Sequence, residues 1–190
     1  MANTDTPFGL RPVRMAGGAP YNGAVNMYYV ASTDATALFI GDPVVKDGSS
    51  DTDGVASVIR ASAGGPFTGV VQGFVPDGTI DQTGYRAAST AAYVLVADDP
   101  NLEFEIQEDS VGGALAAADI GLNASVIVAA GSTYTLRSGV ELDTSTKATT
   151  AGLELKILGI SPRPGNAVGT NAKVRVRIND HTEAHASAGL

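Results

Sequence analysis

The chain has 190 residues, a formal net charge of −8 from 12 Lys and Arg against 20 Asp and Glu, and no Cys. This length fits one domain or two small ones, and the lack of cysteine excludes disulfides and thiolate metal sites. Nucleic-acid binding depends on neutralising phosphates with Lys and Arg, so we expect no nucleic-acid partner. We also expect no membrane segment, because no stretch approaches about 18 consecutive apolar residues.

Residues 1–24 are expected to form an extended N-terminal arm. Pro7, Pro12 and Pro20 alternate with several glycines, a spacing that leaves no room for a regular element. The arm is locally basic and carries apolar side chains with nothing nearby to bury them. It is either a flexible terminus or an arm that becomes ordered against a partner. The candidate partner-binding residues of the arm are Phe8, Leu10, Arg11, Val13 and Arg14.

Residues 25–180 are expected to form an all-β body, because short β-rich runs alternate with turn dipeptides such as Asp53-Gly54. The expected strands span 25–30, 37–40 continuing through 45, 55–60, 67–75, 92–97, 102–107, 125–130, 133–142 with a break, 153–160 and 173–179. This spacing is typical of a β-barrel or sandwich. A soft division near 76–85 separates two lobes in this interpretation.

Two further segments complete the expected organisation. Residues 113–123 are rich in alanine and end near Gly121, which predicts one short helix of about two turns. Residues 181–190 show neither turn signals nor apolar anchors, and we expect them to form a flexible C-terminal tail.

Residues 173–178 alternate apolar and basic side chains, so that Lys173, Arg175 and Arg177 share one face of a strand. Glu103 and Glu105 alternate with apolar residues in the same way, which favours a solvated acidic face. In a second interpretation this acidic face lies beside the basic stripe, across a strand pair or a subunit boundary. Opposed charges in a sheet contribute about 0.2 to 1 kcal/mol each, so they would determine register and partner choice more than stability.

The sequence offers few parts for catalysis, and we expect neither an enzyme nor a cofactor or metal site. Its two histidines, His181 and His185, both lie close to the C-terminal end of the chain. A polysaccharide-cleaving enzyme that uses Glu103 with Glu105 or Glu108 is the least favoured alternative. A glycan-binding adhesive β-module is the second alternative.

Glycan platforms are usually exposed aromatic side chains, but the chain has no Trp and six Tyr. Three of these, Tyr28, Tyr29 and Tyr93, fall in strands expected to belong to the core. The composition therefore gives little support to the adhesive module.

Several stretches resemble one group of tailed-bacteriophage virion proteins. The opening Met-Ala-Asn-Thr-Asp-Thr-Pro-Phe-Gly-Leu-Arg-Pro-Val-Arg of residues 1–14 is one of them. The others are residues 32–45, 85–90, 96–100, 104–109, 115–123, 155–159 and 169–174, so the resemblance covers most of the chain. The group looks like the capsid decoration, or cement, proteins that coat heads of the HK97 type.

This resemblance implies a β-barrel or β-tulip body, an N-terminal arm that lies across capsid subunits, and a place on the outer surface of the virion after assembly in the host cytoplasm. The implied partners are the major capsid protein and further copies of the chain itself, in a trimer rather than a dimer. The shared stretches carry no catalytic signature, so no functional residue is transferred from the family.

Overall fold

The structure, a computed structural model, describes residues 3–77 and 83–184. This part of the chain contains two sheets and one short 3-10 turn, and the expected all-β class is confirmed. The elements are β1 (Arg11–Met15), β2 (Asn26–Val30), β3 (Pro43–Ser50), β4 (Ala56–Arg60), β5 (Gly69–Phe74), β6 (Ala92–Ala97), β7 (Leu102–Gln107), η1 (Ala117–Asp119), β8 (Asn123–Ile127), β9 (Glu141–Ala148), β10 (Leu155–Ile160) and β11 (Lys173–Ile178).

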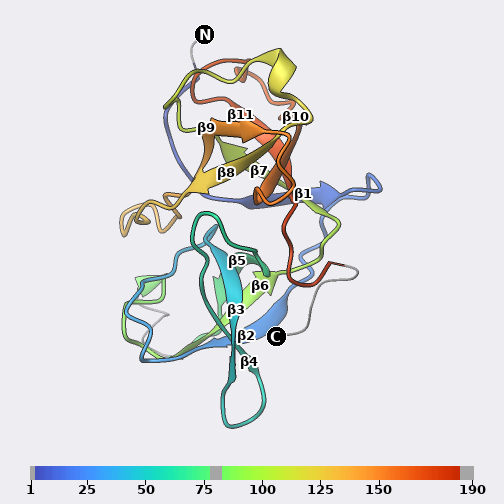
Figure 1. The fold of residues 1–190 in the computed structure, drawn as a ribbon. Helices are drawn as coiled ribbons and strands as arrows, with labels where there is room; N and C mark the ends of the chain where they lie inside the picture. The colour runs from blue at the N-terminus through green and yellow to red at the C-terminus, as the bar shows by residue number, and fades with distance from the viewer. Residues whose placement is uncertain (1–2, 78–82, 185–190) are drawn as a thin grey trace.

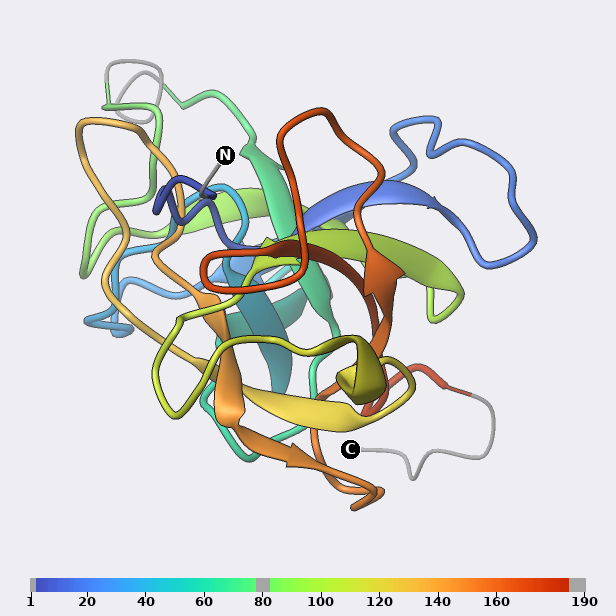
Figure 2. The same cartoon turned by 90° about the horizontal axis from the view of Figure 1, so that it is seen from above.

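The strands form two sheets, which Figure 1 shows one above the other. The upper one, which we call sheet A, is antiparallel and has the order β1-β7-β11-β10-β8-β9. The lower one is a closed barrel with the order β2-β4-β3-β5-β6, in which β2 and β4 are parallel. Viewed from above in Figure 2, the long loops of sheet A extend around its strands.

The chain changes from the barrel to sheet A between β6 and β7, at residues 98–101. The soft division expected near 76–85 is therefore misplaced: that segment joins β5 to β6 within the barrel, and its residues 78–82 lie outside the described part. A proline- and glycine-containing stretch can be a loop within one sheet as readily as a linker between two.

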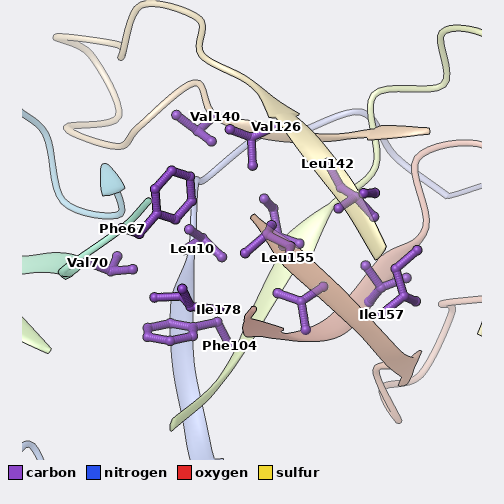
Figure 3. Close-up of a cluster of buried hydrophobic side chains, with 14 of the residues drawn as sticks. Leu10, Phe67, Val70, Phe104, Val126, Val140, Leu142, Leu155, Ile157 and Ile178 are labelled. Carbon is purple, nitrogen blue, oxygen red and sulfur yellow. The ribbon is translucent and has the colours of Figure 1, made fainter. Parts of the chain in front are cut away.

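One hydrophobic cluster is shared by the two sheets, and Figure 3 shows it in close-up; a second cluster lies within the barrel, around Val30, Val58 and Val94. Val70 of the barrel strand β5 and Phe67, just before it, are fully buried in the same cluster as Phe104 and Leu155 of sheet A. The backbone of Phe67 also pairs with His181, which follows β11. Burial of shared apolar surface joins the two sheets into one packed body.

The N-terminal segment is not an extended arm. Residues 11–15 form β1 at the edge of sheet A, paired with β7. Leu10 is 1% exposed, and Figure 3 shows its side chain among those of the cluster that the two sheets share. Pro12 is compatible with this strand because a proline is tolerated on a sheet edge, where its missing N–H removes no ladder bond. Residues 1–2 lie outside the described part.

The start of the C-terminal segment is held in place, contrary to the expected flexible tail. His181 is 4% exposed, and the hydroxyl oxygens of Thr182 and Thr68 are 2.8 Å apart. Lys46 Nζ lies 2.7 Å from Glu183 Oε1. Residues 185–190 lie outside the described part.

Three other expectations differ from the structure. The helix expected over 113–123 is reduced to η1, because Gly113 and Gly121 adopt φ values of 115° and 96° that interrupt a right-handed helix. Most of residues 133–142 form a loop, and the strand begins at Glu141. Lys46, Asp47 and Gly48, which have turn chemistry, lie inside β3, where the pairing with β4 shifts register.

Candidate functional site

The outer surface of sheet A carries most of the cations of the chain. In β7 and β11 the apolar side chains alternate toward the core, as Phe104 and Val176 do, while the charged ones point the other way. The sequence pattern of both strands is therefore realised residue by residue. The stripe of Lys173, Arg175 and Arg177 lies next to Glu103 and Glu105 on one face.

Strand register aligns these charges in two rows across the sheet. In one row, Glu103 lies opposite Arg14 on one side and opposite Arg177 on the other. In the second row, Glu105 has the same relation to Arg11 and Arg175. Since directly opposed residues of paired strands share a face, each glutamate lies between two arginines.

The row of Glu103 continues onto β10, where Lys156 lies opposite Arg177. In the row of Glu105, Gly159 lies opposite Arg175. A Cβ built on Gly159 would lie 3.4 Å from Arg175 Nη2, so the glycine leaves room for the guanidinium to lie along the sheet. The cationic surface therefore spans four adjacent strands.

Both glutamates are buried, at 5% exposed for Glu103 and 2% for Glu105. Glu103 Oε2 accepts a bond of 2.7 Å from Arg14 Nε and one of 3.2 Å from Arg175 Nη1. The expected solvated acidic face is therefore wrong. The second interpretation applies, with both stripes within one chain and across the β7–β11 strand pair.

Glu105 is held by two other arginines. Arg11 Nη2 pairs with Glu105 Oε2, and Arg163 Nη1 lies 3.3 Å from Glu105 Oε1. The side chains of Arg11 and Arg163 remain 47% and 41% exposed, so each ion pair has its carboxylate inside and much of its guanidinium in solvent. Such guanidinium groups can still donate to an external acceptor, because arginine has five N–H donors.

We call this surface the basic face. It holds seven of the 12 Lys and Arg of the chain, with Glu103 and Glu105 among them; Asp5 and Glu141 lie at its end, where both accept hydrogen bonds from Gln107, the residue opposite Lys173. The cations of the basic face are Arg11, Arg14, Lys156, Arg163, Lys173, Arg175 and Arg177. Within the described residues, the side chains of Lys156 and Arg177 make no hydrogen bond or ion pair. An excess of cations on an acidic chain suits an acidic partner.

The five residues expected to bind a partner through the arm take different positions. Arg11 and Arg14 belong to the basic face, and the Phe8 ring lies 5.0 Å from the Arg11 guanidinium carbon. Val13 is half-buried in β1, and Leu10 belongs to the core. In this conformation Leu10 is therefore not accessible to a partner.

Lys156 and Arg163 were missed by the sequence analysis. Lys156 lies between Leu155 and Ile157 in an expected strand, and this alternation could have marked it as an outward cation. Arg163 lies between two prolines in the loop after β10, where no periodicity gives its direction.

The three glutamates considered for polysaccharide cleavage do not form a solvent-accessible pair of carboxylates. Glu103 and Glu105 are held by arginines, and Glu108 is 0% exposed, with Oε2 accepting 2.9 Å from the Ser110 amide. Burial raises the pKa of Glu108. No group of three His, Asp or Glu side chains is placed to hold a metal ion within residues 3–77 and 83–184.

The tyrosines give the glycan alternative one exposed aromatic ring. Tyr28 is 7% exposed in the barrel, and the rings of Tyr29 and Tyr93 are 5.5 Å apart on neighbouring strands. Tyr134 is 95% exposed at the tip of the loop before β9. In the part of the chain that the structure covers, no helix is long and apolar enough to cross a membrane.

Comparison with known proteins gives no match: no family model fits the chain, and no curated protein or solved structure is similar to it. The functional argument therefore depends on the residues of the chain and on the surface they form.

Proposed function

We propose that this chain is a capsid decoration protein that binds the outer surface of an HK97-type phage head and bridges neighbouring subunits of the major capsid protein. The observation that carries the proposal is the basic face. An otherwise acidic chain collects seven cations on one face of a sheet and leaves four of its arginines 22 to 47% exposed. The sequence resemblance described above supports the same function.

The basic face has the properties of a protein-binding surface. Arginine is enriched in protein interfaces, and its planar guanidinium forms paired bonds with carboxylates. The strands beneath are packed on the core, so the cations are held in fixed rows. An acidic strip on a capsid subunit would face these rows, and charge complementarity would orient the two proteins during docking.

Bridging follows from multivalency. We propose that the chain acts as a homo-oligomer, a trimer rather than a dimer, on the virion surface after assembly in the host cytoplasm. Linked copies that each bind one capsid subunit hold neighbouring subunits together even when a single contact is weak. In this function the chain transforms no molecule and needs no cofactor.

Charge-neutralising variants of the basic face test this proposal more sharply than deletion of the arm. Removal of residues 2–20 would take away β1 and the buried Leu10, so lost binding would only report lost folding. Arg177→Gln and Lys156→Gln instead remove one cation each without breaking an ion pair in the described structure. Arg60→Gln on β4 is the control, because the Arg60 side chain is also half-buried and makes no hydrogen bond or ion pair there; its charge acts on the buried Asp42, so the unfolding midpoint of this variant is measured as well.

The measurement is binding to purified heads, by co-sedimentation and by electron microscopy of the intact particle. We expect the wild-type chain and Arg60→Gln to appear as knobs at defined symmetry positions, and each basic-face variant to bind several-fold more weakly. Heads that lack the protein, or unchanged binding by both variants, would contradict the proposal. Tight binding to duplex DNA at physiological salt would instead assign the basic face to nucleic acid.

A further inference from the structure

A groove lies at one end of the basic face, between the N-terminal segment and the loop after β10. Its volume is about 500 Å³. The residues that form it and enter the argument are Asn3, Thr4, Thr6, Arg163, Asn166 and Lys173. Arg163 also contacts Glu105, so the groove is continuous with the basic face.

Both walls of the groove are fixed by hydrogen bonds. Asn3 Nδ2 donates to the carbonyls of Ala167 (2.9 Å) and Thr170 (2.8 Å), which holds the N-terminal wall. Asn166 Nδ2 donates to the carbonyls of Ser161 (2.9 Å) and Lys173 (2.7 Å), which closes the loop. The groove is therefore preformed, and little conformational entropy would be lost when a ligand binds.

Two cations belong to this groove. Lys173 is 8% exposed, and its ammonium donates to the carbonyls of Thr4 and Asn171 rather than to a carboxylate. The carboxylates of Asp5, Glu105 and Glu141 attract this ammonium electrostatically but make no hydrogen bond to it. Arg163 stands beside it with its side chain 41% exposed. The groove thus places a guanidinium and an ammonium together with no hydrogen-bonded counter-ion on the ammonium.

Free hydroxyls complete the lining. Among the described residues the Thr4 hydroxyl makes no hydrogen bond, and the Thr6 hydroxyl makes one of 3.5 Å to the Thr4 carbonyl. The Thr4 hydroxyl can therefore donate to a ligand oxygen, and the Thr6 hydroxyl can do so by exchanging its long bond to the Thr4 carbonyl. A mixture of cations and neutral hydrogen-bonding groups along an open groove fits an extended polypeptide, which offers side-chain carboxylates and backbone amides together.

We propose that this groove binds a carboxylate side chain, Asp or Glu, in an extended segment of the partner protein, with Arg163 and Lys173 as the cations that receive it. This inference rests on the proposed function, because it names the chemistry that the partner presents at the end of the basic face. The Thr4 and Thr6 hydroxyls bind the same segment.

Calorimetric titration of the full chain with blocked peptides tests the groove. The probe is acetyl-Gly-Glu-Gly-Glu-Gly-amide, and the reference peptide has Gln in place of both Glu. We expect the Glu peptide to bind at least about tenfold more tightly than the Gln peptide, and Arg163→Gln to weaken binding by a similar factor. Amide NMR shifts should be concentrated at Thr6 and Asn166.

Two further variants separate binding from folding. Thr4→Val removes a hydroxyl from an exposed residue without changing charge, and should weaken the Glu peptide severalfold while leaving the unfolding midpoint unchanged. Arg60→Gln should bind like the wild type. Equal binding of both peptides, shifts located elsewhere, or displacement of the peptide by equimolar inorganic phosphate would each overturn the inference, the last in favour of a small-anion site.

Head-binding assays on the same variants separate this inference from the proposed function. If Arg163→Gln and Thr4→Val decorate heads as tightly as the wild type, the groove assignment fails and the proposed function stands. If the wild type does not bind heads although the Glu peptide occupies the groove, the proposed function fails and the carboxylate site remains.

Discussion

Arg11 and Arg14 point to the same side of sheet A, although they are three positions apart in a strand whose side chains alternate. Arg11 lies opposite Glu105 and Arg14 opposite Glu103, and the register shifts between Pro12 and Arg14. Val13 is the extra residue of this bulge. A bulge inserts one residue into one strand, which restores the same facing after an odd interval.

Deletion of Val13 should therefore leave the two arginines on one face. Without the bulge they would be two positions apart in a regular strand, still opposite Glu105 and Glu103, so we expect the free energy of unfolding to fall by less than about 1 kcal/mol. Insertion of one alanine after Val13 should cost more, about 2 kcal/mol, because the bulge must then hold two extra residues or Arg14 loses its glutamate. Urea denaturation measures both changes. A deletion that costs as much as the insertion would show that Val13 is needed for the pairing.

Arg86 should be the most sensitive charged residue of the barrel. It is 0% exposed, and its guanidinium donates to the carbonyls of Ala31 (2.7 Å), Asp34 (2.9 Å) and Thr90 (2.7 Å), as well as to Thr36. Lysine cannot reproduce this planar set of bonds. We expect Arg86→Lys to lower the free energy of unfolding by about 3 kcal/mol, because buried carbonyls lose their donors.

Arg60→Lys provides the comparison for that measurement. The Arg60 side chain is half-buried on β4 and makes no hydrogen bond within the described residues, and lysine keeps its charge, so the change should stay within about 0.5 kcal/mol. Equal losses in the two variants, measured by urea denaturation, would mean that the Arg86 bonds do not stabilise the barrel.

For two strands the expected first and last residues are the observed ones. Residues 92–97 and 102–107 were expected as strands and form β6 and β7: the first is a continuous apolar run of strand length, and the second alternates apolar and polar residues. The segment before β9 contains β-branched residues but folds as a loop. Its conformation depends on packing against distant residues such as Phe39, which lies 2.3 Å from a Cβ built on Gly131.

The sequence could predict which charged residues of β7 and β11 face outward, but not that β1 adds its arginines to the same face. The charges on β7 and β11 follow from their alternation. Nothing in the Arg-Pro-Val-Arg run of β1 marks Val13 as a bulge, and a spacing of three residues predicts opposite faces. The basic face therefore required the register of β1 on β7, which is a long-range property of the fold.

Acidification should relieve an unfavourable charge at Glu141. Burial raises the pKa of this carboxyl, and the nearby charges of Asp5, Asp109 and Glu108 raise it further, although Gln107 Nε2 donates to it at 2.8 Å. The folded state therefore binds this proton more tightly than the unfolded state, whose carboxyl has a pKa of about 4.3. The contribution of Glu141 to stability thus improves as pH falls through the raised folded-state pKa.

Glu141→Gln removes this titration while keeping an acceptor for Gln107. We expect the variant to be more stable than the wild type at pH 7, and the difference to shrink as the pH approaches about 4, where the wild-type carboxyl is protonated in both states. Urea midpoints at several pH values, with unchanged m-values, measure this. A difference that is constant with pH, or that grows on acidification, would contradict the assigned sign.

The first residues after β11 should contribute to stability although the sequence marks them as a tail. The Thr182 amide donates 2.9 Å to the Phe67 carbonyl, and Lys46 pairs with Glu183 at 2.7 Å. A chain that ends at residue 180 should therefore unfold about 2 kcal/mol more easily than one that ends at residue 184, because it loses these bonds and the buried His181. Both truncations lack residues 185–190, so thermal and urea unfolding compare only 181–184. Equal stability of the two chains would mean that the contacts between this segment and Phe67 do not fasten the barrel to sheet A.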